Sequence, residues 1–208
     1  MKFFQTIIQF IMVTTHKYSL DESHGIMHSF DTLHNAHKIY SEELKNFPEM
    51  ETHEKIIYAA AAVHDMCDKK YMNELEGIKQ IDTLLENNMS ELEISVVHDI
   101  VEKMSYSKVK TNGFPEMGKY QSAYNVVREA DLLGAYDFNR AIVYSLYNKN
   151  DDIDEAYEET CQIFLNRMLK HEEDGLLTFD YTKKDAIEKK NHSLQQMKQW
   201  KKILKIMK

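Results

Sequence analysis

Proline and glycine are scarce in this chain, which has two prolines and six glycines among 208 residues. Proteins built from many short strands need frequent turns, and turns draw heavily on these two residues. Their scarcity argues against an all-β fold and favours long helices. No run of alternating polar and apolar residues demands a sheet, and no internal repeat is found. The hydrophobic content of 43% suffices for one large core.

Cysteine is also rare. Cys67 and Cys161 are too few for a disulfide framework, and no CxxC pair occurs. This usage is typical of proteins in a reducing compartment, so we expect a cytoplasmic protein. A membrane-spanning run is lacking as well. The segment 1–15 is apolar, but it is too short to span a bilayer, and Gln5 and Gln9 interrupt it with no small-residue cleavage site after them. We expect it to be a first helix on the core, with no membrane partner.

The chain has no excess of positive charge, since 34 acidic residues outnumber 26 lysines and arginines to give a net charge of −8. A protein that holds nucleic acid by bulk electrostatics needs the opposite sign, so no nucleic-acid partner is expected. The stretch 183–208 differs, because nine lysines there accompany two acidic residues. Its apolar residues recur at helical spacing, which favours an amphipathic helix docked on the protein. These residues are Trp200, Ile203, Leu204 and Met207.

Helical periodicity and cap signals divide the chain into expected helices. Ser90 with Glu93 forms a capping box, and Thr182 with Asp185 is a second cap signal. The segment 105–120 contains glycine and proline and is expected to be the longest loop. The expected helices are 1–15, 24–44, 51–65, 74–87, 90–104, 121–147, 153–170 and 182–207, with a turn at 148–152. We predict an all-α bundle of about seven or more helices that forms one domain over 1–208.

Four potential metal ligands lie in three of these expected helices: His28, the adjacent pair His64 and Asp65, and Asp131. The pair follows a smooth apolar run, 58–63, whose small residues can pack closely against neighbouring helices and aim both side chains into the core. Two neutral imidazoles and two carboxylates make a mixed nitrogen and oxygen site. Such a site suits a divalent cation that keeps positions open for water and substrate.

The order His, His-Asp, Asp resembles the HD superfamily of metal-dependent phosphohydrolases. A bare His-Asp dipeptide is common. Its position after an apolar helix, with an upstream HxxxH and a downstream ADLL segment, is what makes the match specific. The segments that carry the resemblance are DESHGIMH (21–28), AAAVHDMCDKKY (60–71), EKMSYSKVK (102–110) and READLLGAYD (128–137).

The resemblance implies an HD-type helical bundle with the metal-site core at about 21–140 and with helices 153–207 completing the bundle. It implies that one divalent metal ion is bound by His28, His64, Asp65 and Asp131. Manganese, nickel, magnesium, iron, cobalt and zinc all remain open as the metal.

The resemblance also implies roles for residues beside the ligands. Asp68 would be the catalytic residue that orients or deprotonates the attacking water. His24, four residues before His28, would face the substrate from the same helical face if the helix extends that far. Lys70 matches a basic residue often found after the motif, and Lys108 can likewise offset the charge of a phosphate.

Two positions depart from the pattern of many relatives. Asp31 stands where an arginine is common, and Gly25 replaces a common aspartate. These departures leave the substrate open. We predict a hydrolase that cleaves a phosphoester or phosphoanhydride of a small molecule, with a nucleotide as the first choice. The oligomeric state is also open.

Two alternatives to this function are kept. Some HD-fold proteins use two irons to activate oxygen, and the second His-Asp pair, His98 and Asp99, would be the source of an extra ligand. The other alternative is a non-catalytic module that binds a metal or a nucleotide. The intact Asp68 argues against it, because a decayed site need not keep a well-placed carboxylate.

Overall fold

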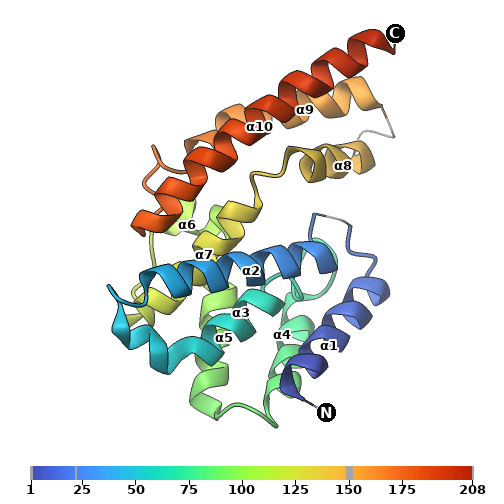
Figure 1. Ribbon diagram of the computed structural model, residues 1–208. Helices are drawn as coiled ribbons and strands as arrows, with labels where there is room; N and C mark the ends of the chain where they lie inside the picture. The colour runs from blue at the N-terminus through green and yellow to red at the C-terminus, as the bar shows by residue number, and fades with distance from the viewer. Residues whose placement is uncertain (1, 22, 149–151, 208) are drawn as a thin grey trace. The chain divides into compact units, whose positions relative to one another are not determined.

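The computed structural model describes residues 2–21, 23–148 and 152–207, and every regular element in these ranges is helical (Figure 1). Ten α-helices and three short 3-10 helices are found there, and no strand is present in the same ranges. The prediction of an all-α fold with about seven or more helices is confirmed. The turn expected at 148–152 lies mostly outside the described residues.

Contacts between the helices group the chain into two units, Met1–Asp131 and Leu132–Lys208. A single domain over 1–208 stays a prediction. The first unit contains two 3-10 helices, η1 (Pro48–His53) and η2 (Gly118–Tyr120). Its α-helices are α1 (Phe3–Lys17), α2 (Ile26–Glu43), α3 (Glu54–Val63), α4 (Glu74–Leu85), α5 (Glu91–Lys103), α6 (Tyr106–Asn112) and most of α7 (Gln121–Gly134).

Helix α3 is the centre of the first unit and packs against α1, α2 and α5 (Figure 1). Residues 59–63 of this helix are each at most 1% exposed. Four of the five are alanines, which lose no side-chain entropy in a helix and let neighbouring backbones approach closely. The helix begins at Glu54 rather than at residue 51, because the segment from Pro48 forms η1. The apolar run thus leads directly to His64 at the buried end of the helix.

The first helix and the capping box follow the sequence prediction. In α1, Ile7, Ile11 and Thr14 are buried on the core. Ser90 and Glu93 form the reciprocal capping box of α5. No helix among the described residues is both long enough and apolar enough to cross a bilayer.

The prediction of one helix over 121–147 is wrong. Helix α7 ends at Gly134, and α8 (Phe138–Asn148) begins after Asp137. The Asp137 side chain accepts hydrogen bonds from the backbone of Asn139 and Arg140, as an N-cap residue does. Arg140 Nη2 in turn donates to the carbonyl of Gly134 at 2.7 Å, which satisfies an oxygen at the end of α7.

Two further local predictions are wrong, again because of hydrogen bonds at the ends of helices. The segment expected to be a long loop contains α6, which is capped by Ser105 and ends at Gly113 with φ of 76°. Helix α10 (Asp180–Ile206) begins before the expected cap residue Thr182. The Thr182 hydroxyl donates instead to the carbonyl of Phe179. In α6 the Ser105 cap starts a helix inside the expected loop, and in α10 the bond from Thr182 to Phe179 takes the place of the expected cap.

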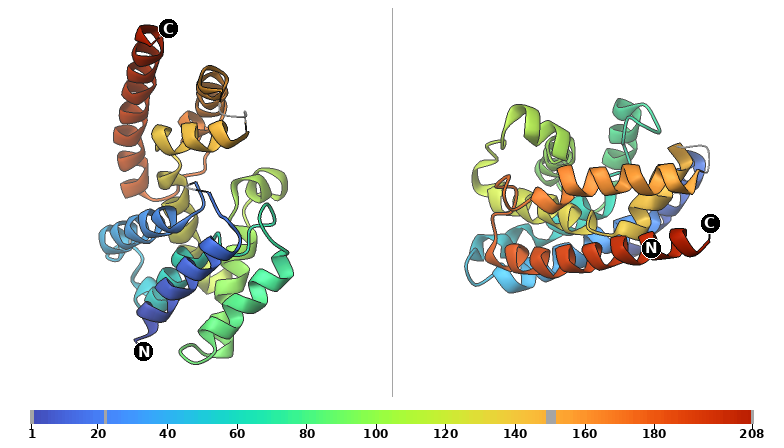
Figure 2. Two further views of the ribbon diagram at one scale, coloured as in Figure 1. Left: turned by 90° about the vertical axis from the view of Figure 1, so that its right-hand side faces the viewer. Right: turned by 90° about the horizontal axis from the view of Figure 1, so that it is seen from above.

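The second unit contains α8, α9 (Ile153–Asn166), η3 (Met168–Lys170) and the long, lysine-rich α10. Helix α8 packs against α9, and α10 packs on both. Figure 2 shows α10 as the long red helix. The predicted apolar stripe docks only in part: Trp200 Nε1 donates to Asn139 Oδ1 at 2.8 Å, whereas Ile203 and Met207 are 49% and 80% exposed.

Candidate metal centre

The structure brings His28, His64, Asp65 and Asp131 together within the first unit. His28 Nε2 lies 3.0 Å from His64 Nε2, 3.1 Å from Asp131 Oδ1 and 3.3 Å from Asp65 Oδ2. His64 Nε2 lies 3.3 Å from Asp65 Oδ2 and 3.6 Å from Asp131 Oδ1. Even without Asp131, the side chains of His28, His64 and Asp65 form a group that could hold a metal ion.

The four potential ligands are placed by three helices. His28 lies in the first turn of α2, and His64 and Asp65 follow the last turn of α3. Asp131 lies in α7, and the preceding residue, Ala130, accepts a hydrogen bond from Asn35 of α2 at 3.2 Å. This buried bond ties α7 to α2 next to the carboxylate. Close packing of α2 on α3 does the same for the two imidazoles.

The spacing of the donor atoms fits a shared cation. Nitrogen and oxygen ligands about 2.0–2.2 Å from one ion, at the angles of tetrahedral or octahedral coordination, are about 3.0–3.5 Å from each other. The observed separations of 3.0–3.6 Å correspond to this range. Asp65 Oδ2 is buried, and no hydrogen-bond donor is aligned on it. These features are what a set of ligands around one divalent ion requires.

The His64 ring has a defined tautomer. Its Nδ1 lies 2.9 Å from the carbonyl oxygen of Ala61, and a carbonyl oxygen can only accept. In the neutral ring, Nδ1 therefore carries the proton and Nε2 directs its lone pair at the cluster. A metal-ligating histidine commonly has this second hydrogen bond, which fixes the ring orientation.

The electrostatics of the cluster also favour a cation. Burial opposes charge on His64, but the carboxylates of Asp65 and Asp131 outweigh it and raise the pKa of the imidazole well above 6.5. Burial likewise opposes charge on both aspartates, yet the two imidazoles lower the pKa of each carboxyl well below its usual value. Without a metal, the raised pKa of His64 favours a proton on this ring, and that proton offsets part of the carboxylate charge. A divalent cation would replace the proton on His64.

The cluster is closed on one side and open on another. The side chains of His28 and His64 are 4% and 2% exposed, whereas those of Asp65 and Asp131 are 16% and 28% exposed. Water and a small substrate can therefore approach from the side of the carboxylates.

Three predicted site residues gather beside the cluster. Asp68 Oδ2 lies 3.9 Å from His24 Nε2 and 3.8 Å from Lys70 Nζ, and Lys70 Nζ lies 3.2 Å from His24 Nε2. The rings of His24 and His28 have centroids 6.5 Å apart. The expectation that His24 extends α2 is wrong, because the helix begins at Ile26. His24 lies in the turn before it.

Lys108 is engaged elsewhere. Its ammonium lies 3.1 Å from Glu74 Oε1 and donates to the carbonyl of Glu102 at 2.6 Å. A substrate phosphate would have to displace Glu74 to use this charge. His98 is not in the group of possible ligands found among the described residues. Its neighbour Asp99 pairs with Lys103 at 2.8 Å.

Two residues near the site were not predicted. Asp21 and Tyr71 contact each other and His24. Both lie inside the segments DESHGIMH and AAAVHDMCDKKY, at their first and last positions. Along the chain, Tyr71 is close to the His64–Asp65 pair and Asp21 is close to His28, and this was the available signal. Their contact could not be predicted, because α2 and α3 lie between them in the sequence.

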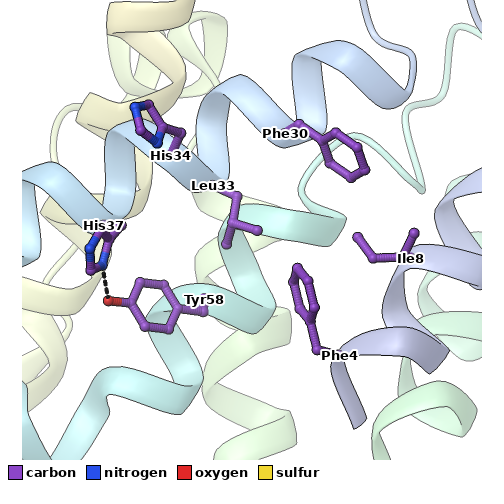
Figure 3. Close-up of a pocket in the computed structure, with 7 residues that line it drawn as sticks. All are labelled: Phe4, Ile8, Phe30, Leu33, His34, His37 and Tyr58. Carbon is purple, nitrogen blue, oxygen red and sulfur yellow. Dashed lines mark hydrogen bonds between the residues drawn. The ribbon is translucent and has the colours of Figure 1, made fainter. Parts of the chain in front are cut away.

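A separate apolar groove of about 530 Å³ lies between α1, α2 and α3 (Figure 3). Phe4, Ile8, Phe30 and Leu33 converge on it, and His37 Nδ1 is hydrogen-bonded to the Tyr58 hydroxyl at 2.8 Å at one end. None of the predicted site residues lines this groove. The cluster of His28, His64, Asp65 and Asp131 therefore remains the candidate site for chemistry.

No protein-family model and no curated protein matches the chain. Among solved structures, a crystal structure of a Lactobacillus plantarum protein from Northeast Structural Genomics matches with a TM-score of 0.69 and 20% sequence identity. The match covers 97% of this chain and 96% of that chain. At this identity it shows a shared fold.

Proposed function

We propose that this protein is an HD-type metal-dependent phosphohydrolase. Its substrate would be a phosphoester or phosphoanhydride of a small molecule, with a nucleotide as the first choice. The observation that carries the proposal is the convergence of donor atoms from His28, His64, Asp65 and Asp131 at separations of 3.0–3.6 Å. The resemblance of the motif order to the HD superfamily supports the type of chemistry.

The four ligands would hold one divalent cation, which when bound polarises a phosphoryl oxygen and lowers the pKa of water from about 15.7 toward about 7. Asp68 would hold the attacking water in line or accept its proton. The ammonium of Lys70 lies beside Asp68 and would offset the charge of the substrate phosphate. The partly exposed carboxylates leave the approach that the substrate needs.

Neither alternative function has a specific observation in its favour. Two irons need ligands beyond the four, and His98 is not among the grouped residues in the described part of the chain. A binding module would need the same cluster but no group to handle water, and Asp68 stands beside His24 and Lys70.

A metal and substrate screen tests the proposal. The protein is stripped with a chelator and reloaded in separate samples with manganese, nickel, magnesium, iron, cobalt or zinc. Each sample is offered nucleoside mono-, di- and triphosphates, and phosphate and pyrophosphate release are measured. Metal-dependent release supports the hydrolase. Two irons per chain with oxygen consumption would support the oxygenase. Tight metal binding without turnover would support the binding module.

A further inference from the structure

Asp21 accepts several hydrogen bonds beside the cluster of His28, His64, Asp65 and Asp131. The Ser23 hydroxyl donates to its Oδ1 and the Tyr71 hydroxyl to its Oδ2, each at 2.5 Å. Burial alone would raise the pKa of Asp21, but hydrogen bonds from His24, Ser23 and Tyr71 hold it well below its usual value. An ionised carboxylate only accepts. The single proton of each hydroxyl is therefore directed at Asp21.

The same two hydroxyl oxygens contact one nitrogen of His24. Nδ1 lies 2.5 Å from Ser23 Oγ and 3.0 Å from the Tyr71 hydroxyl oxygen. Because both hydroxyl protons are directed at Asp21, both oxygens face His24 as acceptors. Nδ1 must then be the donor. In the neutral ring the proton lies on Nδ1, and Nε2 keeps its lone pair.

The contact at Nε2, on the other side of the His24 ring, independently indicates that the proton lies on Nδ1. Lys70 Nζ lies 3.2 Å from Nε2. A lysine ammonium has three donors and no acceptor, so Nε2 must accept. The Lys70 side chain is 51% exposed, and its four-carbon stem is flexible. The hydrogen bond that Lys70 donates to His24 holds the ammonium near Asp68, 3.8 Å from Asp68 Oδ2.

We propose that Asp21 and Tyr71 are positioning residues which, through His24, hold the Lys70 ammonium beside Asp68 to receive an oxyanion of the substrate phosphate. His24 is then the link between the two ends of the chain of hydrogen bonds. The phosphate-binding part of this inference rests on the proposed function, whereas the tautomer of His24 does not. Two experiments separate these parts.

The first experiment measures the His24 tautomer by nitrogen-15 NMR of the magnesium-loaded protein at mildly alkaline pH, where an ordinary imidazole is neutral. His24→Gln assigns the signals. We expect the proton on Nδ1 in the unchanged protein. In Asp21→Asn, the amide donates to one hydroxyl, which can turn and donate to Nδ1, so the proton moves toward Nε2. Tyr71→Phe should shift the tautomer in the same direction.

Tyr58→Phe is the matched control, because it removes a hydroxyl bonded to a different histidine, His37 (Figure 3). It should leave His24 unchanged. A proton on Nε2 in the unchanged protein would overturn the proposal. So would a tautomer that responds to neither Asp21→Asn nor Tyr71→Phe in folded protein.

The second experiment measures binding of inorganic phosphate to the magnesium-loaded protein by calorimetry. Lys70→Met should weaken binding about 10-fold, the loss of one hydrogen bond to a charged group. Tyr71→Phe should weaken it in the same direction. The double variant should be no weaker than Lys70→Met alone, because Tyr71 acts through Lys70. Additive losses would overturn the positioning role. If the unchanged protein binds no phosphate, the phosphate-binding part of this inference fails. The release assay still decides the proposed function, and the His24 tautomer still decides the chain of hydrogen bonds.

Discussion

At the residue scale, His64 shows why the cluster calls for a cation. One ring nitrogen is committed to the carbonyl of Ala61 at 2.9 Å, and the other faces a second imidazole at 3.0 Å and a carboxylate oxygen at 3.3 Å. An imidazole lone pair beside a carboxylate is unfavourable unless a proton or a metal lies between them. The side chain is 2% exposed, so water cannot screen the repulsion effectively.

Asp65→Ala should remove bound metal and hydrolysis together while the protein still folds. The substitution deletes the ligand whose Oδ2 lies 3.3 Å from both imidazoles. A metal that binds only the native state stabilises it by mass action, so the rise in melting temperature on adding metal should also vanish. Metal analysis, turnover and thermal denaturation on one preparation measure all three.

Asp99→Ala is the control for this variant. It changes the carboxylate of the other His-Asp pair, which is 46% exposed and bonded to Lys103. It should keep metal, activity and the metal-induced shift. An Asp65→Ala protein with full metal content and full activity would contradict the assignment.

Asp68→Asn should separate chemistry from metal binding. Asp68 Oδ1 accepts a hydrogen bond from the backbone of Lys70 at 2.8 Å, and an asparagine oxygen can still accept it, so the turn should survive. The amide cannot take a proton from water, so kcat should fall by roughly 10²–10⁴-fold. Metal content should stay near normal, and KM should change little if Asp68 acts mainly in the transition state. Unchanged kcat would remove Asp68 from the mechanism, and lost metal would make it a ligand or its support.

At the scale of elements, the turn after α3 positions most of the site. Consecutive turns over this segment, with Met66, Asp68 and Tyr71 donating backbone hydrogen bonds to residues three earlier, bring the side chains to one end of α3. Helix α4 packs directly on this turn. A Cβ built on Gly77 of α4 would lie 2.7 Å from Cys67 Cβ and 2.8 Å from Cys67 Cα. Glycine therefore sets the distance between α4 and the segment that carries Asp65 and Asp68.

Gly77→Ala should destabilise the protein, although alanine is favoured over glycine in a helix by about 1 kcal/mol. The added methyl overlaps a backbone carbon that cannot move aside alone, and overpacking costs about 1–3 kcal/mol. Metal affinity should fall as well, because the turn with Asp65 must shift. Chemical denaturation and metal titration measure the two effects.

Thr83→Ala tests whether any change in α4 has the same result. Thr83 is exposed, and its hydroxyl donates only to the carbonyl of Lys79 within the helix. Its replacement should leave stability within about 0.5 kcal/mol and metal affinity unchanged. Equal stability of the Gly77→Ala protein and the unchanged protein would show that α4 can move without cost.

At the scale of the whole molecule, the metal would act as a crosslink within the first unit. Its ligands come from α2, α7 and the end of α3, which are distant along the chain. Binding to the native state therefore stabilises contacts that depend on the packing of three helices. The effect should depend on pH, because protons compete for the same atoms.

The melting temperature of the metal-free protein should fall toward alkaline pH. The pKa of His64 is raised above 6.5 by Asp65 and Asp131 against the effect of burial, so its contribution to stability is fully present below about pH 6.5 and is lost as the pH rises through the raised value. The lowered pKa values of both aspartates act oppositely: their contribution is present above about pH 3.8 and is lost as the pH falls through the lowered values.

Metal replaces the proton on His64, so manganese should raise the melting temperature most at alkaline pH and should release protons on binding. Thermal denaturation across pH, with a chelator and with manganese, measures the difference. Asp65→Ala should flatten it. A manganese effect that grows toward acid pH would contradict proton competition at this cluster.

Local patterns determined the helical class and several elements. The scarcity of proline and glycine and the helical periodicity predicted helices, and the structure has them. The Ser90–Glu93 capping box, which involves residues close along the chain, is also present. Prediction was wrong where two local signals competed. Asp137 caps a new helix inside a continuous periodic stretch, and Gly113 ends a helix inside an expected loop. Periodicity alone does not show which partner a backbone group takes.

By itself, the sequence determined an all-α protein with a His, His-Asp, Asp series of ligand types. Only the tertiary structure decided that His28 and His64 nitrogens lie 3.0 Å apart, that Tyr71 meets Asp21, and that Lys108 is paired with Glu74. Helix formation follows from the residues within each segment. Contacts between segments depend on how buried helices pack, and a shift of about one residue, 1.5 Å along a helix, is enough to separate or join two side chains.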